Sequence, residues 1–166
     1  MSLPNTYTSQ NETGCCAIPD IPSWQDKEHI FDNEKFIKMQ TKSFLYMPLN
    51  MSKIMKLLDN IATAADAKPK PEQAMVLSHD ISPWRAEHLY RVTKQVEGQA
   101  TVVLNGTYIS KVFTGPYNNA KKWYKQMHSF ANQKNKTIKT LYMFYTTCPK
   151  CAKHYGNNYV IGLAEV

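Results

Sequence analysis

The sequence predicts an α+β fold in which two halves repeat one strand-helix-strand-strand plan. When the 166-residue chain is shifted against itself by about 68 residues, residues 44–50 fall on residues 112–118. The apolar stripes of two helical segments then also coincide. A lone half of this size buries little apolar surface, so we expect halves 36–99 and 100–166 to pack about a pseudo-twofold axis. The predicted fold is a mainly antiparallel sheet with both helices on one face.

Composition favours a single globular domain. Hydrophobic residues make up 43% of the chain and charged residues 20%, an ordinary balance for a folded domain. Residues 1–30 are rich in Ser, Thr, Asn and Pro and lack an apolar period, so we interpret them as an N-terminal extension. Residues 31–166 then form the domain.

In the first half, residues 36–46 are rich in aromatic and apolar side chains and predict a strand. A helical stripe follows at spacings of three and four, made of Met51, Ile54, Met55, Leu58, Ile61, Ala62 and Ala65. Asn50 or Ser52 provides its polar start. Strands are predicted at residues 73–78 and 87–96, with a turn between them.

The second half repeats this order. Residues 101–113 alternate as a strand does, and Gly115 and Pro116 then turn the chain. Asn118 or Asn119 caps a helix whose stripe comprises Ala120, Trp123, Tyr124, Met127, Phe130 and Ala131. Residues 139–146 and 158–166 supply the last two predicted strands.

Charge and hydropathy indicate which classes of partner the protein is expected to bind. The formal net charge is +7, but the lysines are scattered and the only arginines are Arg85 and Arg91. Nucleic-acid recognition relies heavily on arginine, so we interpret the charge as a solvated face and nucleic acid as an unlikely partner. No apolar run reaches the roughly 20 residues that a membrane span needs, and the N-terminus lacks a signal-peptide pattern. A cytoplasmic protein without a membrane partner is expected.

Two segments resemble a known family. Residues 106–117, followed at once by an amphipathic helix, resemble the GyrI-like small-molecule-binding domain, the effector-binding domain of multidrug-responsive regulators. Residues 144–160, which contain Cys148-Pro149-Lys150-Cys151, look like a bacterial subset of that group loosely labelled hydrolases. The chain departs from complete regulators because it has no helix-turn-helix segment, and the cysteine pairs are not part of the general pattern.

The resemblance implies an aromatic cleft between the halves that admits an amphipathic or cationic small molecule. Some relatives only bind, and a few are implied to hydrolyse electrophilic compounds with a tyrosine and a glutamate. Candidate ligand-binding residues are Tyr46, Trp84, Tyr90, Tyr108, Tyr117, Trp123 and Glu165. About half of the aromatic side chains must be core. Strand alternation places Tyr142 and Phe144 on the face opposite to Leu141, Met143 and Tyr145.

The alternative function is a hydrolase acting on an electrophilic small molecule or toxin. In it, Glu87 activates a water molecule and Tyr145 orients it. A carboxylate among aromatic side chains has a raised pKa or holds a ligand cation, whereas the simpler interpretation of Glu87 and Glu165 is a solvent-facing strand acid. No histidine has a Ser or Cys partner at a recognisable spacing, which argues against a nucleophilic triad.

The cysteines suggest a third class, a metal or redox module. Cys148 and Cys151 have the C-x-x-C spacing, and a zinc site needs about two further ligands, for which Cys15 and Cys16 are the first candidates and His29, His79 and His154 the others. Adjacent cysteines rarely both bind one ion, but either can approach the C-x-x-C. Because a reducing cytoplasm favours thiolates, we predict that the pairs lie close together and that, if any agent joins them, it is zinc rather than a disulfide. The structural alternative is that residues 148–151 are merely a hairpin turn.

Overall fold

The computed structural model describes residues 3–166, which divide into two compact units. Unit 1 combines Met1–Phe31 with Gly106–Val166, and unit 2 is Asp32–Asn105. Two long strands, β1 (Lys27–Phe44) and β5 (Thr101–Thr114), have residues in both units. Each unit is described by itself below.

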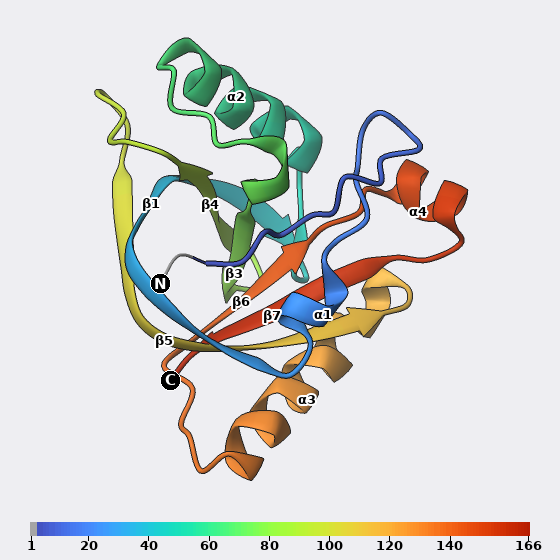
Figure 1. The fold of residues 1–166 in the computed structure, drawn as a ribbon. Coiled ribbons are helices and arrows are strands. Elements are labelled where there is room, and N and C mark those ends of the chain that lie inside the picture. Colours follow the sequence, from blue (N-terminus) through green and yellow to red (C-terminus); the bar gives the residue numbers. More distant parts are fainter. Residues whose placement is uncertain (1–2) are drawn as a thin grey trace. The chain divides into compact units, whose positions relative to one another are not determined.

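Unit 2 is an antiparallel sheet with one helix on it (Figure 1). Its further elements are β2 (Met47–Pro48), α2 (Met51–Ala64), η1 (Pro71–Gln73), β3 (Val76–Ser82) and β4 (Arg85–Val92). The strand order is β2-β1-β4-β3, and every neighbouring pair runs antiparallel.

The apolar stripe of α2 forms the core of unit 2. Leu58 and Ala62 are fully buried against Ile37 of β1 and Tyr90 and Val92 of β4. Burial of a leucine side chain contributes about 2 kcal/mol, so this contact explains why the segment is helical here. The predicted helix is therefore confirmed.

Unit 1 has the same kind of architecture. Its elements, besides β5, are α1 (Ile21–Trp24), η2 (Tyr117–Asn119), α3 (Ala120–Gln133), β6 (Thr140–Tyr145), α4 (Pro149–Tyr155) and β7 (Tyr159–Glu165). β7 lies between β5 and β6 and is antiparallel to both. α3 covers one face of this sheet (Figure 1).

Contact between α3 and the sheet depends on a glycine. Trp123, Met127, Phe130 and Ala131 of α3 are buried against the sheet, as their spacing predicts. At Gly162 of β7, an added Cβ would lie 2.7 Å from the Met127 sulfur. The absence of a side chain at this position is what allows the helix to approach so closely.

The α+β class and the antiparallel pairing are confirmed, but some elements differ from expectation. β1 begins at Lys27 rather than near residue 36, because His29 and Phe31 are buried beside β5 residues of unit 1. β3 extends to Ser82, so the turn before β4 is only Pro83-Trp84. No helix among residues 3–166 is long and apolar enough to cross a membrane.

The alternative in which residues 148–151 form a hairpin turn is wrong, because this segment opens the helix α4. Pro149 occupies the first helical turn, where its missing N–H is no loss, and Cys148 is the N-cap residue. Gly156 ends the helix with a φ of 70°, a conformation that glycine adopts readily.

Candidate functional site

The two faces of the unit 1 sheet are chemically different. Leu141, Met143 and Tyr145 point to the α3 side, where the core lies. Since strand side chains alternate, Tyr142 and Phe144 lie on the opposite face, as the alternation predicted. The sequence left open which of the two faces a helix covers, and the structure assigns α3 to the Leu141 face.

A carboxylate and two tyrosines share the face away from α3. Glu165 of β7 is directly opposite Tyr108 of β5 in the strand register, and Thr140 of β6 is its partner on the other side. Tyr142 belongs to the same face by alternation. We call Tyr108, Tyr142 and Glu165 the acidic tyrosine face.

The surroundings of Tyr108 keep its phenol protonated. Its side chain is 1% exposed and stacks on Phe31 with ring centroids 4.1 Å apart. Burial raises the pKa of Tyr108, and the negative charge of Glu165 raises it further. Glu165 itself is only half-buried. A carboxylate flanked by aromatic faces can attract an organic cation.

Tyr46 and Trp84 form an exposed aromatic corner of unit 2. Both side chains are 57% exposed, and the Tyr46 N–H donates to the Pro83 carbonyl over 3.0 Å. The Trp84 ring lies 5.9 Å from that of Phe44. Leu45 and Tyr46 have positive φ values of 49° and 69°, so this corner is also strained.

The other candidate ligand-binding residues make structural contacts within their own units. Tyr90 is buried under α2 and donates a hydrogen bond to Asp59 over 2.8 Å. Trp123 belongs to the core beneath α3. Tyr117 is half-buried and donates a hydrogen bond to the Thr147 carbonyl.

The two candidate catalytic residues lie in different units. Glu87 of β4 is ion-paired with Lys38 at 3.2 Å. Tyr145 packs edge-on against Tyr117, with ring centroids 5.6 Å apart, beside the α3 core. Each therefore has a structural partner of its own, and their catalytic roles stay predictions.

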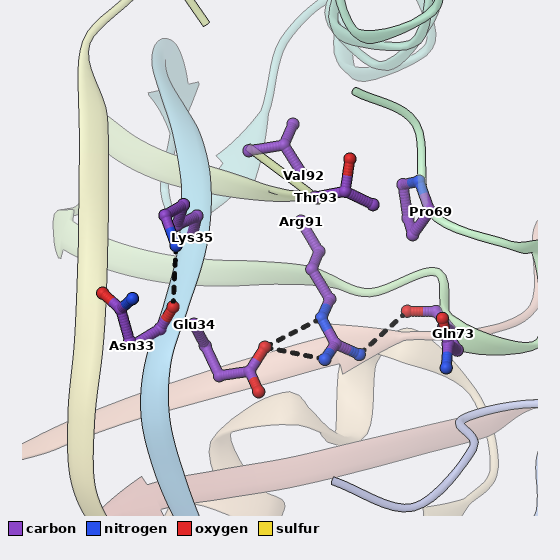
Figure 2. A pocket seen from close by; sticks show the side chains of 8 residues that line it. All are labelled: Asn33, Glu34, Lys35, Pro69, Gln73, Arg91, Val92 and Thr93. Atoms are coloured by element: carbon purple, nitrogen blue, oxygen red, sulfur yellow. Dashed lines mark hydrogen bonds and ion pairs between the residues drawn. The ribbon is translucent and has the colours of Figure 1, made fainter. Parts of the chain in front are cut away.

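Unit 2 contains a small open cavity of about 230 Å³. Figure 2 shows the side chains that line it. Arg91 lies within it and donates to Glu34 over 2.7 and 3.1 Å and to the Gln73 carbonyl over 3.1 Å. The Arg91 guanidinium and the Glu34 carboxylate therefore satisfy one another. The residues that line it are Asn33, Glu34, Lys35, Pro69, Gln73, Arg91, Val92 and Thr93, and the sequence-predicted ligand set contains none of them.

The four cysteines converge in unit 1. The sulfur atoms of Cys15, Cys16, Cys148 and Cys151 all lie within 4.8 Å of one another, and all four residues are free thiols. The predicted approach of the C-x-x-C to the N-terminal cysteines is confirmed, and both N-terminal cysteines take part rather than one. Such a cluster can hold a metal ion.

Thr13 shapes the N-terminal side of this cluster. Its hydroxyl oxygen accepts hydrogen bonds from the N–H groups of Cys15 and Cys16, each over 3.2 Å, and lies 3.2 Å from the Cys151 sulfur. Gly14 supplies the left-handed turn, with a φ of 71°. The cysteine pair is thereby folded back toward α4.

The pKa values of the Cys151 and Cys16 thiols are shifted in opposite directions. Burial opposes ionisation of Cys151, but hydrogen bonds from Thr13 and the neighbouring cysteines outweigh it and lower the Cys151 pKa to about 7. For Cys16, burial dominates and raises the pKa. Cys151 therefore ionises more readily than Cys16.

Sequence reasoning missed the tyrosines that hold the N-terminal segment. The Tyr155 hydroxyl donates to the Cys16 carbonyl over 2.8 Å and accepts from the Glu12 N–H over 3.0 Å. Tyr7 donates to the Thr146 carbonyl and packs against Phe144. The only sequence signal for these contacts was the pair of cysteine motifs itself.

The sequence matches a known family, and the fold is similar to that of solved structures. The chain matches the family described as Bacterial hydrolase over residues 6–166 and belongs to that family. No curated protein sequence matches it. The fold is similar to that of an uncharacterized conserved protein from Listeria innocua, with a TM-score of 0.58, 12% identity, and coverage of 84% of this chain and 91% of that chain.

Two further solved structures share the fold. A hydrolase from Listeria innocua has a TM-score of 0.58 at 12% identity, with 84% of this chain and 90% of that chain covered. SAV2435, in its structure bound to tetraphenylphosphonium, has a TM-score of 0.50 at 9% identity, with 84% and 92% covered. The expected membership of a bacterial hydrolase subset is thus confirmed, and the fold is shared with SAV2435.

Proposed function

We propose that this protein binds cationic aromatic small molecules through the acidic tyrosine face of unit 1. The observation that carries the proposal is the placement of Glu165 opposite Tyr108, with Tyr142 on the same face of the sheet. Aromatic faces attract cations, and a partly desolvated carboxylate adds a charge interaction that water screens only in part. The fold shared with SAV2435, which binds tetraphenylphosphonium, supports the same class of ligand.

The sequence also predicted a cleft between two duplicated halves. The element orders β1-β2-α2-η1-β3-β4 and β5-η2-α3-β6-α4-β7 support the duplication, because in each a long strand precedes a 14-residue helix and two further strands follow it. An experimental structure tests this directly. Superposition should place Met51–Ala64 on Ala120–Gln133 together with the strands that follow.

The binding experiment is a calorimetric titration with tetraphenylphosphonium. We expect Glu165→Gln to weaken binding about tenfold, since loss of one charge interaction of roughly 1.4 kcal/mol changes Kd by that factor. Glu97→Gln, at an exposed loop carboxylate, is the matched control and should leave Kd unchanged. Tetraphenylborate has the same shape and the opposite charge, so it should bind more weakly. Equal binding of both ions, or equal Kd values in wild type and Glu165→Gln, would remove the basis of the proposal.

Hydrolysis is the second candidate, favoured by the family to which the chain belongs. In this alternative, Glu87 activates water and Tyr145 orients it toward an electrophilic substrate. Turnover of activated esters and epoxides separates the two functions. A hydrolase should lose at least a hundredfold in rate in Glu87→Gln, whereas a binding protein shows no turnover above the buffer rate.

A further inference from the structure

The four-cysteine cluster has the dimensions of a tetrahedral zinc site. Zinc-to-sulfur bonds of about 2.3 Å place the four sulfur atoms of a tetrahedron about 3.8 Å apart. The sulfurs of Cys15 and Cys16 are 3.8 Å apart, and every pair in the cluster lies within 4.8 Å. Contraction by less than 1 Å in the wider pairs would complete the geometry.

A disulfide between the adjacent cysteines would be strained. Neighbouring Cα atoms are about 3.8 Å apart across a trans peptide, below the roughly 4.4 Å at which the usual range for disulfides begins. Oxidation would therefore favour pairing Cys15 and Cys16 separately with Cys148 and Cys151. A single cation satisfies all four sulfurs at once.

Two separate segments bring the ligands together. Cys148 is the N-cap of α4 and Cys151 lies in its first turn, so their spacing of three places both side chains on one side of the helix. Hydrogen bonds to Thr13 direct Cys15 and Cys16 to the same point. The Thr13 hydroxyl also contacts the Cys151 sulfur, as a partner in the outer shell of a metal site does.

Few contacts join the part of the N-terminal segment next to Cys15 and Cys16 to α4. They include the contact of Thr13 with Cys151, the Tyr155 hydrogen bonds and a 3.6 Å pair between Glu12 and His154, whose side chains are both more than half exposed. Exposed pairs of this kind contribute about 0–1 kcal/mol. A metal bound to four thiolates would fix the segment far more firmly.

We propose that Cys15, Cys16, Cys148 and Cys151 bind one zinc ion as a structural site that fastens the N-terminal segment to α4. Each thiol that binds releases its proton, and the site then carries zinc and four thiolates. All four positions are filled by protein, so the zinc has no place for water or substrate. The site is therefore separate from the acidic tyrosine face, and its test does not depend on ligand binding there.

The test is metal analysis of protein purified with reductant and without chelator. Wild type should contain about one zinc per chain, and the double variant Cys148→Ser/Cys151→Ser less than about a tenth of that. Lys150→Ser, an exposed position between the two cysteines, is the matched control and should keep its zinc. Thiol titration should show the four cysteines protected until a chelator is added.

Because the double variant can fail to fold, cobalt titration of the metal-stripped wild type provides a second readout. Tetrahedral thiolate coordination should give intense visible bands that zinc then abolishes. Wild-type protein that takes up neither metal and has four freely reactive thiols would overturn the proposal. So would disulfides between the two segments in protein alkylated at cell harvest.

Discussion

At the scale of single residues, Gly162 limits how closely α3 packs on its sheet. We predict that Gly162→Ala lowers the free energy of unfolding by about 1–3 kcal/mol, because the new methyl group would meet the Met127 sulfur at 2.7 Å and a Phe113 ring carbon at 2.9 Å. Urea unfolding measures the change. In a Met127→Ala background the same substitution should be less destabilising, and an unchanged effect there would contradict this cause.

The buried histidines make stability depend on pH. His88 is fully buried between the hydroxyls of Thr41 and Ser78, each 2.9 Å away, and burial lowers its pKa to about 4. His29, beside Ser110, has its pKa lowered to about 4 by the same cause. Between pH 4 and 6.5 the unfolded chain binds these protons and the folded chain does not, so stability is full above pH 6.5 and falls as the pH drops.

Urea unfolding at pH 7.5 and 5.5 tests this dependence. We predict that His88 alone lowers the unfolding free energy by about 1 kcal/mol between these values. In His88→Gln the loss of stability over this range should be smaller by that amount. A pH dependence identical to that of wild type would show that His88 does not titrate as described.

At the scale of elements, α2 is joined to β4 by a hydrogen bond that matters more than a neighbouring ion pair. The Tyr90 hydroxyl and the Lys68 ammonium both lie 2.8 Å from the same Asp59 oxygen. Tyr90→Phe should cost about 1 kcal/mol, whereas Lys68→Met should cost less than about 0.5, because the ion pair is nearly half exposed. Thermal unfolding of both variants measures the order, and the reverse order would contradict it.

The N-terminal segment gives a second prediction at this scale, which rests on the zinc proposal. Chelation should increase the rate of subtilisin cleavage within residues 8–18 by at least about tenfold, since local opening then lacks its strongest constraint. Cleavage fragments identified by mass spectrometry measure the rate. Lys150→Ser should behave as wild type, and a cleavage rate insensitive to chelator in zinc-loaded protein would show that the metal does not hold the segment.

The helices α2 and α3 were predictable from sequence because the apolar residues of each stripe lie only three or four positions apart. Leu58 and Ala62, and likewise Trp123 and Met127, recur at helical spacing and are buried as expected. The first part of β1 was not predictable, because its strand conformation depends on β5 residues far along the chain. α4 was missed because its Pro149 start suggests a turn as readily as a helix.

At the scale of the whole molecule, the approach of the two cysteine pairs could be predicted from the sequence, because a C-x-x-C pair needs further ligands to bind zinc. The two segments are more than a hundred residues apart. The tyrosines and Glu165 were named from the sequence as well. Alternation alone could not decide which sheet face α3 would cover, so the grouping of Tyr108, Tyr142 and Glu165 required the fold.

A crystal structure with tetraphenylphosphonium would show whether a cationic aromatic molecule binds beside Glu165. We predict the phosphonium ligand on the acidic tyrosine face, with its positive charge near the Glu165 carboxylate, which is the least buried of the three side chains. Ligand bound instead at the exposed corner of Tyr46 and Trp84, or absent from crystals grown at saturating concentration, would contradict the account.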